Sequence, residues 1–209
     1  MSAQGSGGTP PGGGGDPGAL FGGLAALLKE AGGRGHPPVE RWNPPYCGDI
    51  GMRIAGDGTW FYQGSPIGRK PMVKLFASVL RRDGDGRTYL VTPVEKVLVT
   101  VEDAPFMAVE MAVDGEGRET RLSFRTNVED VVTAGPDHPI RFGVDPRSGG
   151  LKPYLLVRGR LEALLTRALY YDLVERAVVE TRDGTETLGI WSDGTFFAMA
   201  AAGPFADLL

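Results

Sequence analysis

Residues 52–80 read MRIAGDGTWFYQGSPIGRKPMVKLFASVL, and this stretch predicts the basic unit of the fold. Met52–Ile54 and Thr59–Gln63 flank the turn Asp57-Gly58, a pattern that is typical of two short strands in a hairpin. Pro71 then suits the first residue of a helix, where its missing N–H has no helical partner to lose. The predicted helix has one apolar face, formed by Met72, Val73, Phe76, Val79 and Leu80. We therefore expect a hairpin followed by a helix with one buried face.

Alternating apolar residues predict further strands along the chain. We expect the strands between Lys96 and Arg125 to form an antiparallel meander, which needs a helix or a second sheet over its apolar face. That helix is predicted over about residues 160–176, and one side of it carries Leu161, Leu164, Leu165, Ala168 and Leu169. The predicted strands are Thr88–Thr92, Glu95–Glu102, Phe106–Val113, Thr120–Arg125, and a final hairpin of Val178–Thr181, Leu188–Trp191 and Thr195–Ala200.

The chain also resembles itself at a distance. Met52–Asp57 (MRIAGD) resembles Ile140–Asp145 (IRFGVD) at an offset of 88 residues. At an offset of 89, the helix positions Met72, Phe76 and Leu80 fall on Leu161, Leu165 and Leu169. Such an echo indicates a repeated unit, although any two strand–turn–helix units share such residues for physical reasons alone. We expect an α+β fold of two small units from an internal duplication, with antiparallel strands and one main helix in each.

The composition of the ends predicts four segments. Residues 1–18 hold eight glycines and three prolines and are expected to form a disordered tail, because they can bury too little apolar surface to offset the entropy of ordering. Residues 19–36 are predicted as a short helix, with an apolar face at Leu20–Leu28, and a linker. Residues 37–103 and 104–209 are the expected N-terminal and C-terminal α+β domains. Since Leu20–Leu28 is too short to span a bilayer and Cys47 stands alone, we expect a cytoplasmic protein.

Charge and composition exclude several classes of function. The chain carries 22 basic and 26 acidic residues, a net charge of −4, which gives no drive toward nucleic acid or a membrane surface. Two histidines and one cysteine argue against a zinc or iron–sulfur site, so we expect no metal and no cofactor. The segment Asp83–Arg87 begins like a calcium loop but fails at later ligand and turn positions. With no catalytic motif present, we favour a binding protein over an enzyme.

Four arginines lie at matched places in the two predicted units: Arg53, Arg69, Arg141 and Arg158. If they share an inward orientation at the seam between the units, they form a cationic pocket for an oxyanion, because the guanidinium group binds oxyanions through two parallel hydrogen bonds. Taken singly, each is equally well a surface or ion-paired residue.

A second polar group follows the apolar residues of the strand that ends near Arg125. Here Arg125 and Asn127 could donate to an anion, while Asp130 and His138 could accept from a sugar or a base. Thr126 or Asn127 could instead cap a short turn. The candidate ligand-binding set is Arg53, Arg69, Arg125, Thr126, Asn127, Asp130, His138 and Arg158.

Four long runs carry a resemblance to a bacterial family catalogued as domain of unknown function 1285: PPVERWNPPYCGDIGMRIAGDGTWFYQGSPIGRKPMVKLF from Pro37, TYLVTPVEK from Thr88, SFRTNVEDVVTAGPDHPIR from Ser123 and PYLLVRG from Pro153. The chain resembles this family over roughly residues 37–200. The resemblance implies a duplicated α+β core, with a second domain superficially like the pleckstrin-homology fold. It also implies a nucleotide-like ligand at the domain interface and a role in signalling rather than catalysis, and it implies no catalytic residues.

Taken together, these observations predict a non-enzymatic regulatory module that binds a small anionic, nucleotide-like ligand between its two domains. Two alternatives from other classes stay open. One is a hydrolase or transferase in which Asp130 and His138 serve as acid and base, which requires the two side chains to lie within hydrogen-bond reach. The other is a scaffold that binds a protein partner, or a second copy of itself, through the apolar helix at residues 20–28.

Overall fold

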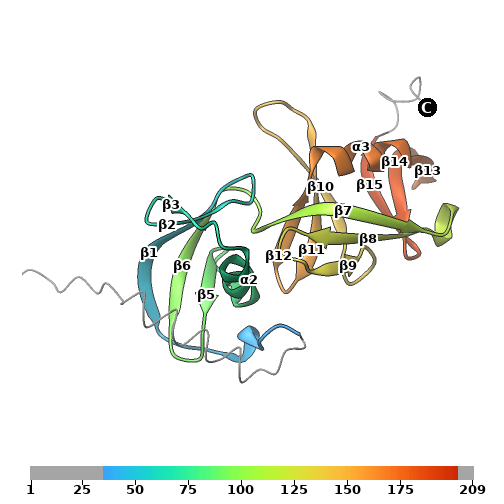
Figure 1. Ribbon diagram of the computed structural model, residues 1–209. Coiled ribbons are helices and arrows are strands. Elements are labelled where there is room, and N and C mark those ends of the chain that lie inside the picture. The colour runs from blue at the N-terminus through green and yellow to red at the C-terminus, as the bar shows by residue number, and fades with distance from the viewer. Residues whose placement is uncertain (1–34, 202–209) are drawn as a thin grey trace, which may run out of the picture.

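The computed structural model describes residues 35–201, which form two lobes joined by a short connection (Figure 1). The described part is mostly β, with two short α-helices and two mixed six-stranded sheets, each accompanied by one helix. A third, three-stranded sheet follows the second helix. Neither α-helix in residues 35–201 is long or apolar enough to cross a membrane. The predicted tail at 1–18 and the predicted helix at 20–28 lie outside the described residues.

The first domain contains one mixed sheet in the order β3-β2-β1-β6-β5-β4. Its two central strands, β1 and β6, run parallel, and all other neighbours run antiparallel. The hairpin and the helix predicted from residues 52–80 are both confirmed. The elements are the 3-10 turn η1 (Val39–Arg41), β1 (Tyr46–Ile54), β2 (Trp60–Tyr62), β3 (Ser65–Pro66), α2 (Lys70–Ser78), β4 (Leu80–Arg82), β5 (Thr88–Val91) and β6 (Lys96–Val101).

The second domain contains a sheet in the order β10-β11-β12-β7-β8-β9, and then α3 and the sheet β13-β14-β15. The predicted final hairpin is confirmed as this last sheet. The elements are β7 (Phe106–Asp114), the 3-10 turn η2 (Gly117–Glu119), β8 (Arg121–Thr126), β9 (Val131–Thr133), β10 (Ile140–Val144), β11 (Leu151–Arg158), β12 (Leu161–Leu165), α3 (Arg167–Glu175), β13 (Val178–Arg182), β14 (Thr185–Ser192) and β15 (Thr195–Ala201).

The two six-stranded sheets repeat one strand order. In both, the first and last strands of the unit pair in parallel at the centre, and two further strands, paired antiparallel, extend the sheet on each side. Strand β1 thus corresponds to β7, and β6 to β12. The units differ in their helices: α2 lies between the third and fourth strands of the first unit, whereas α3 follows the sixth strand of the second.

This correspondence corrects the alignment predicted from the sequence. Met52–Asp57 begins in β1, whereas Ile140–Asp145 begins in β10, and these strands occupy different places in their sheets. The predicted helix over residues 160–176 is wrong in its first half, because residues 161–165 form β12 and the helix begins only at Arg167. Burial alternates along β12, and the strand pairs on both sides, with β11 and β7. Its buried residues, Leu161, Ala163 and Leu165, therefore follow a period of two.

The predicted meander over residues 96–125 is confirmed for β7 and β8, which pair antiparallel, but is wrong for its first strand. Strand β6 belongs to the first sheet and β7 to the second, so the chain passes from one domain to the other through Glu102–Pro105. The proline-rich approach at residues 36–45 contains a 3-10 turn, and Val39 in this turn is buried. The expectation of antiparallel strands throughout fails only at the two central pairs.

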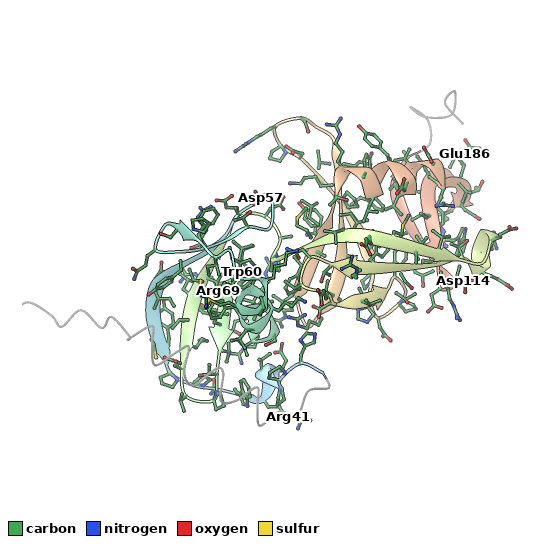
Figure 2. All side chains as sticks on the ribbon, in the orientation of Figure 1. Arg41, Asp57, Trp60, Arg69, Asp114 and Glu186 are labelled. Carbon is green, nitrogen blue, oxygen red and sulfur yellow. The ribbon has the colours of Figure 1, made fainter. Side chains whose placement is uncertain are left out.

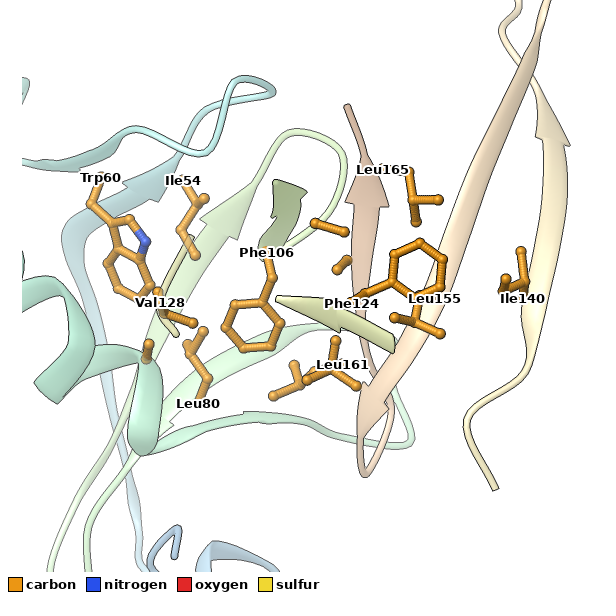
Figure 3. Close-up of a cluster of buried hydrophobic side chains, with 14 of the residues drawn as sticks. Ile54, Trp60, Leu80, Phe106, Phe124, Val128, Ile140, Leu155, Leu161 and Leu165 are labelled. Atoms are coloured by element: carbon orange, nitrogen blue, oxygen red, sulfur yellow. The ribbon is translucent and has the colours of Figure 1, made fainter. Parts of the chain in front are cut away.

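One hydrophobic core serves both domains. It includes Ile54, Trp60 and Leu80 of the first domain together with Phe124 and Leu155 of the second. Phe106, the first residue of β7, has no exposed surface and lies between the two groups (Figure 3). Because this core is continuous, burial of apolar surface stabilises the arrangement of the domains as well as each domain.

Polar contacts also join the domains. Helix α2 lies on the side of the first domain that faces the second (Figure 1). Lys74 on α2 forms an ion pair with Glu129, and the carbonyl oxygen of Ala77 accepts a hydrogen bond from Nη2 of Arg158 at 2.6 Å. In the connection between the domains, Asp103 accepts hydrogen bonds from Lys152 and from the Tyr154 hydroxyl. These contacts fix the position of the seam.

Candidate functional site

Two of the four matched arginines are paired with carboxylates at the surface. Arg53 forms an ion pair with Glu102 and stacks over the ring of Phe61, 4.1 Å from its centroid. Arg141 donates two hydrogen bonds to Glu162, at 2.5 and 2.6 Å. Each of these two guanidinium groups is therefore bound by a carboxylate of its own. A third, Arg69, is exposed at the start of α2 and lies well apart from Arg41 on the first domain (Figure 2).

The fourth matched arginine, Arg158, lies in the seam. Its Nη1 pairs with Asp130, its Nη2 donates to Ala77 of the other domain, and its guanidinium lies 4.8 Å from the centroid of the Phe106 ring. His36 contacts the same carboxylate, with 2.9 Å between Nε2 and Oδ1 of Asp130. Arg158 and Asp130 of the predicted set are therefore brought together, but as partners of each other.

Burial and hydrogen-bonded or charged partners shift the pKa values of Asp130 and Arg158 in opposite directions. Burial raises the pKa of the Asp130 carboxyl, but the hydrogen bond from His36 and the charge of Arg158 outweigh it, so this pKa lies below its ordinary value. Burial lowers the pKa of Arg158, and Asp130 opposes that shift. Asp130 and Arg158 thus form a structural ion pair within the second domain, and Arg158 extends it across the seam through its hydrogen bond to Ala77.

Thr126 and Asn127 shape the turn between β8 and β9. Thr126 is fully buried, and its hydroxyl oxygen accepts hydrogen bonds from the N–H groups of Val128 and Asp130, at 3.3 and 3.0 Å. The side-chain oxygen of Asn127 accepts from the N–H of Met107 at 3.1 Å. The capping interpretation of these residues therefore describes them better than a direct role in ligand binding.

The other two predicted residues lie apart from this cluster. Arg125 pairs with Glu110 across β7 and β8, with 2.7 Å between Nε and Oε2. The hydrogen bond that Arg125 donates to Glu110 is the main cause that holds the pKa of this arginine above its ordinary value. Nδ1 of His138 lies 3.0 Å from the carbonyl oxygen of Leu156. In the described residues, the histidine that contacts Asp130 is His36, so the acid–base alternative lacks the hydrogen bond that it requires between Asp130 and His138.

A different set of arginines surrounds a pocket between the domains. The pocket has a volume of about 570 Å³, and three segments form it: the approach to β1, the end of β4 with the following turn, and the turn between β11 and β12. The first two segments belong to the first domain and the third to the second. The lining residues are Glu40, Arg41, Trp42, Asn43, Arg81, Arg82, Asp83, Gly84, Gly159 and Arg160.

Two glycines allow the segments to approach closely. A Cβ atom on Gly84 would lie 3.3 Å from Nη1 of Arg160, so the guanidinium of the second domain reaches the turn of the first. A Cβ atom on Gly159 would lie 2.9 Å from Oε1 of Glu40, and Gly159 has a φ of +52°, which favours glycine. The pocket thus has two walls from the first domain and a third wall, Gly159 and Arg160, from the second.

The lining of this pocket is positive in an acidic protein. Four arginines and two carboxylates give it a net charge of +2, against −4 for the whole chain. Arg81 and Asp83 are paired with each other, and Lys96 also donates to Asp83, at 2.9 Å. Within residues 35–201, Arg41, Arg82 and Arg160 take part in no ion pair. These three guanidinium groups have no carboxylate partner among the described residues, although Nε of Arg82 donates a hydrogen bond to the carbonyl oxygen of Gly86 at 3.1 Å.

Arg81 holds the pocket wall in place. Its Nη1 donates to the carbonyl oxygens of Val39 and Trp42, at 2.7 and 2.6 Å, and its Nε donates to Asp83 at 2.6 Å. These bonds attach the approach segment to the edge strand β4. Arg81 belongs to strand β4, and its side chain is buried.

Sequence reasoning did not select Arg41, Arg82 or Arg160 as site residues. One signal was present: seven basic residues against three acidic ones between Ile50 and Thr88, an excess that includes Arg82. Arg41 lies outside that window, and only the fold brings Arg160 across from the other domain. In the described residues, no group of three or more histidine, cysteine, aspartate or glutamate side chains could hold a metal ion.

Comparison with known proteins identifies the family. The model of the N-terminal domain of DUF1285, a domain of unknown function, matches residues 37–104. The model of the C-terminal domain of the DUF1285 protein of unknown function matches residues 105–199. No curated protein matches the chain at a significant level.

Two solved structures are similar to this protein. The crystal structure of a DUF1285 family protein from Silicibacter pomeroyi is 48% identical and has a TM-score of 0.77, with 89% of this chain and 97% of that one covered. A DUF1285 family protein from Shewanella baltica is 29% identical with a TM-score of 0.47, and the match covers 60% of this chain and 91% of that one. The resemblance found in the sequence is thus confirmed, and the chain belongs to the DUF1285 family.

Proposed function

We propose that this protein is a non-enzymatic regulatory module that binds a small anionic, nucleotide-like ligand in the pocket between its two domains. The observation that carries the proposal is that three arginines free of ion pairs, Arg41, Arg82 and Arg160, line one pocket of an acidic protein. Planar guanidinium groups bind phosphate through paired, charge-assisted hydrogen bonds. This pocket takes the place of the residues that the sequence pattern selected for the ligand.

The pocket also offers groups suited to a base. Trp42 is half-buried and packs against the core, so its indole is a rigid surface on which a base can stack. Asn43 beside it is exposed, and its amide carries both donors and an acceptor. A volume of about 570 Å³ lies within the usual range for small-molecule sites, about 300–1,000 Å³. A phosphate near the arginines and a base on Trp42 together describe a nucleotide.

A regulatory role fits the position of the pocket. Since both domains contribute side chains, a bound ligand would tie Arg160 of the second domain to Arg41 and Arg82 of the first, and so would favour one relative arrangement of the domains. This proposal includes the duplication of the two units, which the repeated strand order supports. It also includes the likeness of the second unit to the pleckstrin-homology fold.

Titration calorimetry with nucleoside mono-, di- and triphosphates tests the proposal. Adenosine and pyrophosphate, each tested alone, separate the base from the phosphate. We expect saturable binding of at least one nucleotide. At a concentration of 100 times the Kd, it should raise the free energy of unfolding by about 2.7 kcal/mol. If neither nucleotides nor pyrophosphate bind, the proposal is wrong.

Arg160→Gln locates the ligand. Loss of one charge-assisted contact of about 1.5–3 kcal/mol should weaken nucleotide binding roughly 10- to 100-fold. The matched control is Arg87→Gln, which removes the same charge from an exposed position outside the pocket and should leave the Kd unchanged. Equal effects of the two variants would mean that net charge, rather than this pocket, governs binding.

A further inference from the structure

A second pocket, in the second domain, differs from the first in character. It has a volume of about 490 Å³ and lies between the loop that joins β10 to β11, the end of β12 and the start of α3. Its walls are mainly apolar and are formed by Met107, Leu151, Pro153, Leu164, Leu165 and the ring of Tyr170. None of these residues is charged, and the pocket shares no lining residue with the one between the domains.

Charged groups occur at few points of this apolar pocket. Lys152 is bonded to Asp103, and this hydrogen bond keeps the pKa of the lysine above its ordinary value. The carboxylate of Asp145 accepts hydrogen bonds from the N–H groups of Arg147 and Ser148, at 2.7 and 3.3 Å, and these bonds hold the turn of the loop. Lys152 and the carboxylates of Asp103 and Asp145 therefore already take part in hydrogen bonds within the protein.

Arg167 is the exception. Its Nε and Nη2 donate to the hydroxyl of Tyr171, at 3.1 and 2.8 Å, and its guanidinium lies 5.5 Å from the centroid of that ring. Within residues 35–201 it has no carboxylate partner. The tyrosine holds the guanidinium by neutral contacts, so its positive charge is not neutralised, and it remains exposed beside the apolar walls.

From this combination we propose a second binding site, which takes a free amphipathic carboxylate: an acyl chain of medium length that enters the apolar pocket, with its carboxylate on Arg167. Burial of the chain supplies affinity, since each methylene that leaves water contributes a roughly constant increment. The carboxylate pairs with the guanidinium in the geometry that arginine favours. The site is separate from the proposed nucleotide pocket and does not depend on it.

Titration calorimetry of the full chain with hexanoate, octanoate and decanoate tests the site. Each added methylene should tighten binding about fourfold, which is roughly 0.8 kcal/mol per buried CH₂ converted at 1.4 kcal/mol per factor of ten. Decanol, with the same chain and no charge, should bind at least tenfold more weakly than decanoate. No saturable binding of decanoate up to 1 mM, a concentration at which ~4 kcal/mol of binding energy would show, overturns the proposal.

Variants show where the ligand binds. Arg167→Gln should weaken decanoate binding about tenfold or more, while Arg147→Gln, in the neighbouring loop but outside the pocket lining, should not change it. Leu164→Trp fills the pocket and should abolish binding, with a melting temperature measured alongside to show that the chain is folded. If Leu164→Trp folds and still binds decanoate, the acid binds elsewhere and the proposal is wrong.

Two further measurements distinguish this site from the nucleotide pocket and from a lipid-binding surface. Arg160→Gln should leave decanoate binding intact, which makes failure here independent of the nucleotide pocket. Flotation with vesicles of phosphatidylcholine and phosphatidylglycerol should leave the protein unbound. Recovery of the protein with the vesicles, abolished by Arg167→Gln, would show that the surface recognises a lipid bilayer instead of a free acid, and would overturn the proposal as stated.

Discussion

The role of an arginine in this protein depends on its partner, and the partner is usually distant in sequence. Arg158 was predicted as a ligand residue because of its place in a repeated pattern, but its carboxylate partner, Asp130, lies 28 residues earlier and its carbonyl partner, Ala77, lies 81 residues earlier. Nothing local distinguishes such a residue from Arg160, two positions on, which has no ion pair within the described residues. The sequence pattern therefore could not distinguish arginines that are structural, such as Arg158, from those of the proposed pocket.

Asp130→Asn tests the structural role of this pair. The substitution leaves the Arg158 guanidinium largely buried without its counter-charge, which should lower the free energy of unfolding by about 3 kcal/mol in urea titrations. The control is Glu129→Gln, which breaks the more exposed pair with Lys74 and should cost much less, because solvent screens this pair. Equal losses in the two variants would contradict the central role of Asp130.

At the scale of elements, the sequence predicted secondary structure correctly where the apolar residues and turn signals fitted either a helix or a strand, but not both. The β1–β2 hairpin and α2 were predictable, because a DG turn and a proline at a helix start limit the alternatives. The run LEALL at residues 161–165 was not, because Leu161 and Leu165, four positions apart, share a face in a strand as well as in a helix. The two neighbouring strands decide the outcome. The predicted internal repeat was misaligned for the same reason, because it matched Met72 and Phe76 of α2 with Leu161 and Leu165 of β12.

Strand β14 contains a glycine that the fold requires. A Cβ atom on Gly189 would lie 2.4 Å from Cζ of Phe196 and 2.6 Å from the carbonyl oxygen of Phe197, at a bulge between Leu188 and Gly189. Since a backbone oxygen cannot move aside, we expect Gly189→Ala to destabilise the protein by about 2–3 kcal/mol. Hydrogen exchange should show the loss of protection first in the third sheet.

Gly68→Ala is the matched control, because no atom lies within 4 Å of the added Cβ atom and its φ is not in the left-handed region. It should change the free energy of unfolding by less than about 0.5 kcal/mol. A Gly189→Ala variant as stable as this control would show that the β14–β15 pair can open without cost to the rest of the domain.

At the scale of the whole molecule, the sequence predicted two similar units but not how they meet. The two sheets share one strand order, in which β1 corresponds to β7. The sequence similarity instead matched β1 with β10. The seam depends on Phe106, Arg158 and α2, and each of these packs against residues from the other domain. Because contacts of this kind join segments far apart in the chain, periodicity within one segment carries no information about them.

The shared core predicts that the two domains unfold together. Phe106→Ala removes a fully buried ring from the centre of this core, which should cost about 3–5 kcal/mol and separate a single urea transition into two. Fluorescence and far-ultraviolet circular dichroism should give coincident transitions for the unmodified chain and divergent ones for the variant. Val109→Ala on the same strand, 37% exposed, should preserve the single transition.

The parallel pairing of the first and last strands in each unit has a mechanical consequence. The chain enters a unit at one end of its central strand pair and leaves at the opposite end of the neighbouring strand. A pull on the two ends of a unit therefore slides β1 along β6, or β7 along β12, and loads all the hydrogen bonds of that pair at once instead of opening them one after another. Each unit is thus built to resist extension along the chain.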